Sequence, residues 1–294
     1  MSKKQRNRAN RTPQKVSLQP WWKSSAAMGG GAAVIVVVLI VLFIIVGSKS
    51  SSTTQAGFGP VPSSVLSAVT NPSDSVVAAV GTGGQPGKLN RLSGSTVLKD
   101  ADGKPQIIYV GAEYCPYCAA ERWNIVMALA RFGTFSNLQE MMSSSTDVDP
   151  NTNTLTFHGS TYSSSIVDFQ AVELQDRNRQ PFESPSAQVS QIFSSVNRPP
   201  YTALAGGFPF LDVAGRFTLR ATSYDPALLR GLTWDQIASD LSAGSSPVAQ
   251  AIVGNANYLT AAICTVTDNK PTSACSSSVI QNIEATLNAQ PPVG

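Results

Sequence analysis

Histidine and charged residues are both scarce in this sequence of 294 residues. His158 is the only histidine, and charged residues make up 13% of the chain. One histidine excludes metal sites built from several histidines and makes a Ser-His-Asp hydrolase a poor fit. There is also no second CxxC pair to complete a zinc site and no Gly-rich phosphate loop. We therefore expect no metal and no cofactor, and we expect His158 to be a surface or turn-stabilising residue.

A basic segment followed by a hydrophobic one opens the chain. Residues 1–25 carry seven Lys or Arg and no Asp or Glu, whereas residues 26–47 are uncharged and contain a long run of Val, Ile, Leu and Phe. At about 1.5 Å per residue, residues 26–46 reach roughly 31 Å, enough to cross the hydrocarbon core of a bilayer. We predict a cytoplasmic tail at 1–25 and a transmembrane helix at 26–47, with the rest of the chain outside.

The alternative interpretation of this segment is a signal peptide that is cleaved near Val46-Gly47-Ser48. In both cases the bulk of the chain leaves the cytoplasm. Residues 48–62, rich in Ser, Thr, Gly and Pro, predict a flexible linker. We assign 63–294 to one extracytoplasmic domain.

The charge of the external part differs in sign from that of the whole chain. Subtracting the seven basic residues of the tail from the 21 Lys and Arg leaves 14, against 18 Asp and Glu, a net charge of −4. That balance argues against nucleic acid as a partner.

Cys115-Pro116-Tyr117-Cys118 carries the clearest chemical signal. It follows an apolar strand at 107–110 and precedes a helical run at 119–132. A cysteine at a helix N-terminus has a lowered pKa, and the thiolate is the form that attacks disulfides. We expect Cys115 to be the nucleophile and Cys118 the resolving thiol. The alternatives are an inert structural pair or a vestigial one.

Cys264 and Cys275 are expected to form a second, different pair. Cysteines outside the cytoplasm are usually disulfide-bonded, and a polar loop of about 12 residues suits a static bridge worth about 3 kcal/mol. The alternative is a relay that passes electrons to Cys115–Cys118.

The remaining pattern predicts a mixed α/β domain. Alternation at 155–157 and 167–171 predicts a hairpin, and Gly133 is expected to cap the helix after the CxxC. Further strands are predicted at 95–98, 106–111, 138–142 and, around an Ala-Gly turn, within 208–219; further helices are predicted at 63–69, 73–80, 184–196, 233–241, 247–264 and 277–288.

The order strand, CxxC, helix, strand, helix, proline-led hairpin and helices resembles the thioredoxin fold. The residues that carry the resemblance are those at 112–118 and 207–215. In thioredoxin-like proteins the proline that opens the second hairpin is cis and lies against the CxxC. The resemblance therefore implies a cis bond before Pro209, and a substrate-binding role for Phe208 and Pro209 beside Pro116 and Tyr117.

More narrowly, the chain resembles an uncharacterised thioredoxin-like family, domain of unknown function family 929, from about Ser63 to the C-terminus. The matching segments are the CPYC motif, Thr146-Asp147-Val148, Phe157-His158-Gly159 and Pro209-Phe210-Leu211-Asp212. This family implies a fold and no activity.

The chain departs from thioredoxins in two ways. Tyr109 replaces the acidic residue that thioredoxins bury beneath the CxxC, so the proton acceptor of Cys118 is not identified. A segment of about 144–200 is an insertion that can reshape or cover the substrate groove, and extra helices follow at the C-terminus. Arg122 is expected to favour the Cys115 thiolate and Glu113 to oppose it. The alternative is that both are solvated charges beside a groove.

These features together predict a membrane-anchored, extracytoplasmic thiol–disulfide oxidoreductase that acts on protein thiols and disulfides. A membrane redox partner or a membrane complex is the further expected partner. The alternative is a non-catalytic thioredoxin-like accessory or assembly subunit of a membrane complex.

Overall fold

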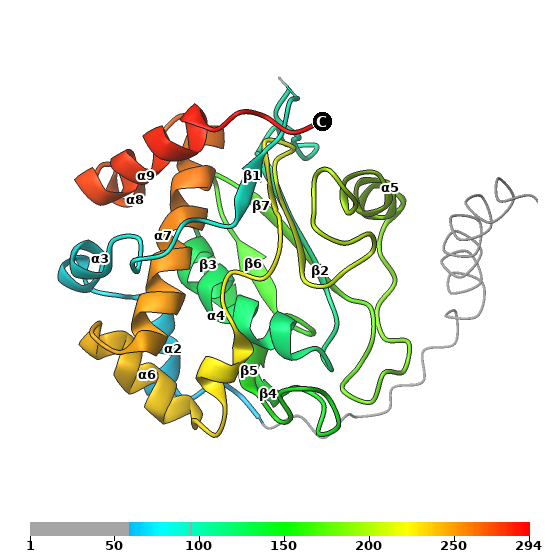
Figure 1. The fold of residues 1–294 in the computed structure, drawn as a ribbon, viewed down its shortest axis with the longest axis vertical. Helices are drawn as coiled ribbons and strands as arrows, with labels where there is room; N and C mark the ends of the chain where they lie inside the picture. The colour runs from blue at the N-terminus through cyan, green and yellow to red at the C-terminus, as the bar shows by residue number, and fades with distance from the viewer. Residues whose placement is uncertain (1–58, 95) are drawn as a thin grey trace, which may run out of the picture. The chain divides into compact units, whose positions relative to one another are not determined.

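A mixed five-stranded sheet lies at the centre of the part of the chain that the structure describes (Figure 1). This computed structural model describes residues 59–94 and 96–294. The predicted tail at 1–25, the predicted transmembrane helix at 26–47 and most of the linker lie outside the described residues. Within the described ranges, no helix combines the length and the apolar character needed to cross a membrane.

The strands of this sheet follow the order β1-β9-β8-β2-β7. β2 (Gln106–Gly111) runs parallel to β7 (Asp168–Glu173) on one side and antiparallel to β8 (Phe210–Val213) on the other. β9 (Phe217–Leu219) pairs with β8, and β1 (Leu89–Arg91) forms the far edge. The chain is therefore a mixed α/β protein, as its sequence predicts.

β2 is buried along its whole length because helices cover both faces of the sheet. Ile107 and Tyr109 belong to the larger core, and Ile108 and Val110 belong to the smaller one. This alternation is the period of two that a strand imposes on its side chains. An apolar sequence with no polar face is what a doubly covered strand requires.

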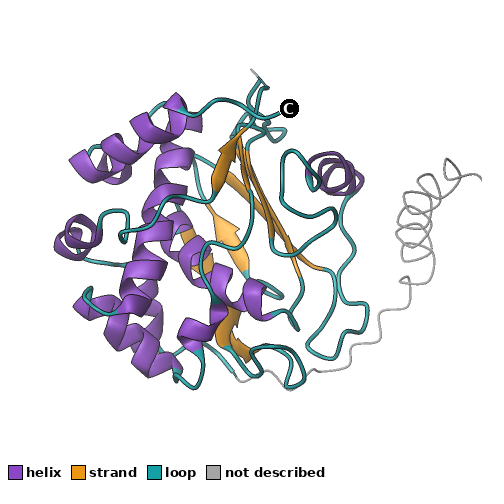
Figure 2. Ribbon diagram, in the orientation of Figure 1, coloured by secondary structure: helices purple, strands orange, loops and turns teal. Residues whose placement is uncertain are grey.

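The helices are divided unequally between the two faces. Figure 2 shows α5 (Ala187–Val196) alone on one side of the sheet and the other helices gathered on the opposite side. On that side α4 (Pro116–Leu129) packs against α7 (Pro247–Val266). The remaining helices are α2 (Ser63–Thr70), α3 (Asp74–Val80), α6 (Trp234–Ala243), α8 (Thr272–Cys275), α9 (Ser278–Ala289) and the 3-10 helix η2 (Pro226–Leu229).

Local signals place most helix starts correctly. Ser186, Ser246 and Ser277 each accept a backbone N–H of the first turn of their helix, the usual function of an N-cap. Thr233 and Gln236 form the predicted capping box of α6. The helix after the CxxC is the exception at its other end. It stops at Leu129, three residues earlier than predicted, and its C-cap is Ala130, not Gly133.

The predicted hairpin of 155–157 with 167–171 is wrong. β5 (Asn153–Thr156) pairs with β4 (Gln139–Met142) in a separate two-stranded sheet, and β7 joins the central sheet beside β2. Alternation identified the strands but carries no information about the partner. β3 (Thr134–Ser136) and β6 (Thr161–Ser163) form another small sheet. The segment 144–200 that we expected as an insertion thus contains one strand of the central sheet.

The predicted strand at 95–98 is also not found. Residues 96–98 form no strand, and Lys99 and Pro105 make only an isolated bridge. The first strand of the structure is instead β1, at 89–91. Polar residues dominate β1, and it pairs with β9 at the edge of the sheet, where a weak hydrophobic pattern is tolerated.

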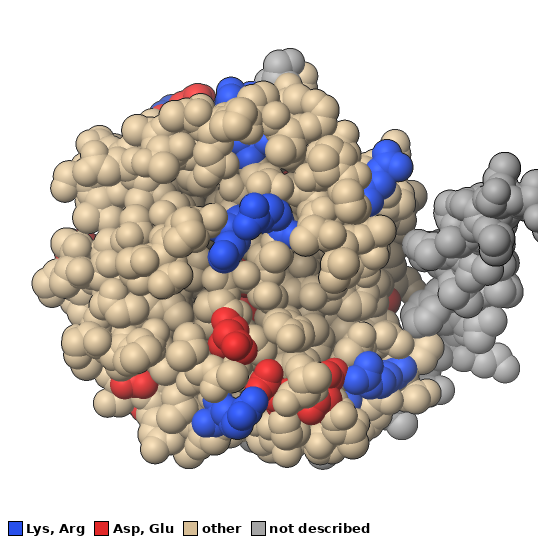
Figure 3. Space-filling view, viewed as in Figure 1, with Lys and Arg blue, Asp and Glu red and all other residues tan. Residues whose placement is uncertain are grey.

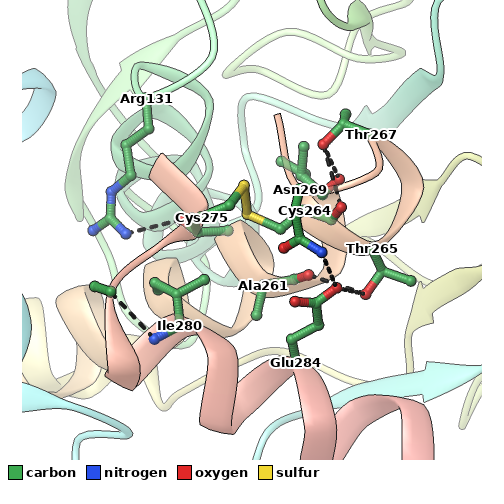
Figure 4. The surroundings of a disulfide bond; sticks show 12 residues. Arg131, Ala261, Cys264, Thr265, Thr267, Asn269, Cys275, Ile280 and Glu284 are labelled. Atoms are coloured by element: carbon green, nitrogen blue, oxygen red, sulfur yellow. Dashed lines mark hydrogen bonds between the residues drawn. A yellow bond between two sulfur atoms is a disulfide. The ribbon is translucent and has the colours of Figure 1, made fainter. Parts of the chain in front are cut away.

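The predicted bridge between Cys264 and Cys275 is confirmed. It joins the C-terminal part of α7 to α8, with a sequence separation of 11 and buried sulfur atoms (Figure 4). Glu284 of α9 accepts hydrogen bonds from Thr265 at 3.1 Å and from Asn269 at 3.4 Å beside it. The disulfide and this carboxylate together hold the three C-terminal helices against one another.

Candidate redox site

The two cysteines of the CPYC motif lie where β2 has ended and α4 begins. Cys115 is the N-cap residue of α4, and Pro116 occupies the first turn, where a proline loses no hydrogen bond. The Cys115 sulfur accepts the backbone N–H of Cys118 at 3.3 Å. The predicted position of Cys115 at a helix N-terminus is confirmed. Both cysteines are free thiols in this structure.

Both thiols are largely shielded from solvent. Cys115 is 6% exposed and Cys118 is fully buried, so Cys115 is the more accessible of the two, by a narrow margin. Tyr114 and Phe208 pack against the small cluster that the cysteines form with Ala112. Tyr117, between the cysteines, is 39% exposed. The aromatic side chains of Tyr114 and Phe208 therefore limit access to Cys115 from solvent.

The peptide bond between Phe208 and Pro209 is cis, as the resemblance to thioredoxins implies. Phe208 precedes β8 and contacts the cysteine cluster, so the structure brings this hairpin and the CPYC motif together across 90 residues of sequence. Phe193 of α5 stacks on Phe208 with 6.0 Å between ring centroids. The α5 helix thus supports the aromatic side chain that lies beside the thiols.

The surroundings of the two thiols shift their pKa values in opposite directions. The pKa of Cys115 is lowered, chiefly by a hydrogen bond with the Cys118 side chain, with further help from the Cys118 backbone N–H and the positive charge of Arg122; burial opposes this. The pKa of Cys118 is raised well above its usual value, chiefly by burial. The first thiolate to form therefore belongs to Cys115, the expected nucleophile.

A buried ion pair lies next to the cysteines. Arg122, one turn after Cys118 on α4, donates to Glu173 of β7 through Nε at 2.8 Å and Nη2 at 2.7 Å, and both side chains are fully buried. Nη2 also donates to the carbonyl of Ala112 at 3.1 Å. Sequence reasoning identified Arg122 and missed Glu173. The sequence did contain a signal for Glu173: it ends a strand in which half of the residues are apolar. A buried acidic residue is rare unless it is paired, so a basic partner could have been sought.

Glu113 behaves differently from Arg122. Its buried carboxylate accepts a hydrogen bond from Thr156 at 2.7 Å, and burial raises its pKa. The predicted opposition between Glu113 and the Cys115 thiolate is not among the effects that set the Cys115 pKa. Instead, Glu173 is the carboxylate that acts on the pair, raising the pKa of Cys118.

Loops from the segment 144–200 cover one side of the site. Arg179 lies over the ring of Tyr114, with its guanidinium carbon 4.0 Å from the centroid, and pairs with Asp147 at 2.7 Å. The backbone N–H of Ser144 donates to the carbonyl of Tyr114 at 2.9 Å. Tyr114, which immediately precedes Cys115, is therefore held between two loops.

His158 is exposed and lies at a turn, as predicted. Its Nδ1 lies 2.6 Å from Glu183, and its ring contacts Phe182 with 4.1 Å between centroids. The hydrogen bond with Glu183 raises the pKa of His158. Across residues 59–94 and 96–294, no group of three or more His, Cys, Asp or Glu side chains is placed to hold a metal ion.

Comparison with known proteins gives a family and nothing closer. No curated protein and no solved structure matches the chain. The family whose model matches is described as Domain of unknown function (DUF929), and the match covers residues 95–265, more than half of the chain and including the CPYC motif and Pro209. The chain therefore belongs to the family Domain of unknown function (DUF929).

Proposed function

We propose that this chain is a membrane-anchored, extracytoplasmic thiol–disulfide oxidoreductase that acts on protein substrates through Cys115 and Cys118. The observation that carries the proposal is the pairing of two free thiols at the start of α4, where the pKa of Cys115 is lowered and that of Cys118 is raised. Such asymmetry is what a nucleophile and a resolving thiol require.

We also propose that the domain is thioredoxin-like. The chain order supports this: β2, the CPYC motif, α4, the parallel strand β7, α5, the β8–β9 hairpin and then helices. The cis bond before Pro209 at the start of that hairpin, and the contact of Phe208 with the cysteine cluster, are the further features that the resemblance implies.

In the reducing direction, the Cys115 thiolate attacks one sulfur of a substrate disulfide. A mixed disulfide forms, and the other substrate sulfur leaves as a thiolate that takes up a proton. The Cys118 sulfur then attacks Cys115, which closes the Cys115–Cys118 disulfide and releases the reduced substrate. Oxidation of a substrate dithiol follows the same steps in reverse. In this proposal Phe208 and Pro209, with Pro116 and Tyr117, contact the extended segment that carries the substrate sulfur; the contact of Phe208 with the cysteine cluster supports this role.

The location follows from the first part of the sequence. The uncharged, hydrophobic segment 26–47 is the proposed membrane anchor, and the basic residues of 1–25 support a cytoplasmic tail, with the domain outside. There, oxidation or disulfide shuffling is favoured, since net reduction needs electrons delivered across the membrane by a membrane redox partner. On the face seen in Figure 3, charged side chains are sparse and the basic ones form no continuous patch, which supports a protein partner over a polyanion.

Trapping tests the proposal directly. In the full-length chain, Cys118→Ser removes the resolving thiol, so mixed disulfides with substrate proteins accumulate on Cys115 and disappear on reduction. The matched control is Cys115→Ser with Cys118→Ser, which forms none. The reduction potential of the pair gives a second measurement, expected between about −270 and −120 mV. No adducts, together with a potential below about −300 mV, would indicate a structural disulfide and contradict the proposal.

The low exposure of Cys115, at 6%, favours a second candidate function. In it the domain is a non-catalytic accessory or assembly subunit of a membrane complex, and the CPYC pair is vestigial. This candidate expects Cys115 in the folded chain to resist iodoacetamide, whereas the oxidoreductase expects it to react faster than an ordinary thiol at neutral pH.

A further inference from the structure

The end of β2 brings together three buried polar side chains from three elements. Glu173 of β7 lies opposite Gly111 in the parallel register. The ring of Tyr109 lies against Gly111, because a Cβ added there would be 2.5 Å from Cζ of Tyr109. Arg122 of α4 donates to Glu173 and to the carbonyl of the next residue, Ala112. The three side chains thus converge on one dipeptide.

That dipeptide is part of the redox site. Ala112 packs in one buried cluster with Cys115 and Cys118, so the dipeptide that the three polar side chains contact adjoins the two thiols. The positive charge of Arg122 acts on both sulfur atoms: it opposes the burial that raises the pKa of Cys118, and it helps to lower the pKa of Cys115.

Two donors in this group have no acceptor among the described residues. The hydroxyl of Tyr109 and the Nη1 group of Arg122 are buried and make no hydrogen bond. Tyr109 is fully buried, and burial keeps its hydroxyl protonated by raising its pKa. An unpaired buried donor is costly and rare, and such groups often mark a catalytic or redox role.

The missing acceptor is available in another state of the same site. Both cysteines are free of disulfide bonds here. A protonated thiol is a weak acceptor, whereas a thiolate is a strong one. Cys118 is fully buried, so no solvent can stabilise its thiolate. Any stabilisation of that anion must come from the protein.

We propose that Tyr109 and Arg122 form a thiolate-binding site for Cys118, in which their two unpaired donors stabilise the resolving sulfur as it loses its proton. The inference rests on the proposed function, because resolution is the step it serves. Cys118 attacks the Cys115 sulfur of the mixed disulfide, the intramolecular disulfide forms, and the bond from Cys115 to the substrate breaks. The departing substrate thiolate takes up one proton from solvent, which balances the proton that Cys118 releases.

Two carboxylates lie near this site, and one of them, Glu173, opposes formation of the Cys118 thiolate. Glu173 holds Arg122 in place, and its negative charge raises the pKa of Cys118. Glu113 is the other acid nearby; its buried side chain is bonded by Thr156, and the charge of Arg122 acts on it. The two members of the Arg122–Glu173 pair therefore have opposite effects on Cys118: Arg122 favours its thiolate, and Glu173 disfavours it.

Ellman's reagent isolates the resolving step in the full-length chain. Cys115 attacks the reagent and releases one nitrothiobenzoate; Cys118 then attacks the mixed disulfide and releases the second. Stopped-flow absorbance measures the rate of the second release at a series of pH values. This rate depends on the fraction of Cys118 that is present as the thiolate. We expect Tyr109→Phe to slow the second release about tenfold or more and to move its pH midpoint upward, with little change in the first release.

Glu173→Gln is expected to do the opposite. It removes the restraining charge but leaves an oxygen that can accept from Arg122, so the second release becomes faster at pH 7. A merely structural role cannot produce opposite shifts in the two variants. Tyr162→Phe is the matched control: its hydroxyl donates to the carbonyl of Leu129 at 2.9 Å, at the far end of α4, and its loss leaves both releases unchanged.

The outcomes separate this inference from the proposed function. If the wild-type chain resolves and Tyr109→Phe resolves at the same rate, the thiolate site is wrong and the oxidoreductase stands. If the wild-type chain never releases a second equivalent, Cys118 does not resolve and both proposals fail. Tyr109→Phe removes one oxygen atom from an intact core, so it decides the question even if Glu173→Gln does not fold.

Discussion

The aromatic ring of Tyr109 occupies the space that a side chain at position 111 would need. A Cβ on Gly111 would lie 2.5 Å from Cζ of Tyr109 and closer still to its hydroxyl oxygen. The glycine thus allows the largest side chain of β2 to lie along its own strand, over position 111. This relationship between neighbours on one face of a strand is the basis of the first prediction.

Gly111→Ala is expected to destabilise the protein by about 1–3 kcal/mol, the usual cost of overpacking a core. The added methyl group must displace Tyr109, which is fully buried. Urea unfolding measures the change. Gly94→Ala is the control, because the nearest atom to its Cβ would be the carbonyl oxygen of Gly215 at 3.6 Å. Equal midpoints for the two variants would contradict the close contact.

The buried pair of Arg122 and Glu173 leads to a second prediction. Arg122→Met is expected to lower the free energy of unfolding by about 3–5 kcal/mol, because Glu173 then becomes a buried charge without a partner. Arg122→Met combined with Glu173→Leu is expected to recover most of this loss. Arg179→Met, at an exposed pair with Asp147, is the control, with an effect of about 0–1 kcal/mol. A double variant as unstable as the single one would contradict this account.

Removal of the Cys264–Cys275 bridge tests its structural role. With both cysteines replaced by alanine, we expect a loss of about 3 kcal/mol, from the greater freedom of the unfolded chain. Thermal and urea unfolding measure this loss. Trapping of substrates through Cys115 is expected to continue unchanged below the new unfolding temperature. Loss of trapping in the folded variant would instead support the electron relay.

Asp212 predicts a pH dependence of stability. It lies buried on β8, where burial raises its pKa to about 7. The unfolded chain releases this proton near pH 4, whereas the folded chain holds it until about pH 7. The folded state therefore loses stability as pH rises between these values, by on the order of a few kcal/mol.

Asp212→Asn measures that contribution, because the amide oxygen can still accept the backbone N–H of Gly215, which lies 2.7 Å from the carboxylate. Urea unfolding of both proteins at pH 5 and pH 8 is the experiment. The stability of the variant relative to the wild type is expected to rise with pH. A difference that is constant between the two pH values would show that Asp212 ionises normally in the fold.

The contact between Arg179 and Tyr114 predicts the accessibility of Cys115. Arg179→Ala removes the guanidinium from the tyrosine ring, so Tyr114 becomes freer to leave its position beside the thiols. We expect iodoacetamide to modify Cys115 severalfold faster in this variant, measured by mass spectrometry in the native state. Arg198→Ala is the control, because the Arg198 side chain donates to the carbonyl of Ser195 in the last turn of α5. If both variants react at the wild-type rate, Tyr114 does not limit access.

Local signals in the amino-acid sequence determined much of the candidate redox site. The apolar strand, the cysteine, the proline and the helical run are adjacent in sequence, so the placement of Cys115 at the start of α4 follows from neighbours alone. The pairing of Cys264 with Cys275 and the capping box at Thr233 also depend on short separations. Composition alone likewise divides residues 1–47 into a basic segment and a hydrophobic segment, because charge and hydropathy are properties of the individual residues.

Only the tertiary structure decided which strand pairs with β2 and which charges reach the thiols. Alternation placed β7 correctly as a strand but paired it with the wrong partner, because the period of two is the same in every sheet. Glu173 and Arg122 are 51 residues apart in the chain, and they come into contact only when β7 lies parallel to β2. The burial of Cys115 likewise depends on Phe208, which arrives from a distant hairpin. Contacts of this kind depend on how the whole chain closes, which short-range pattern does not encode.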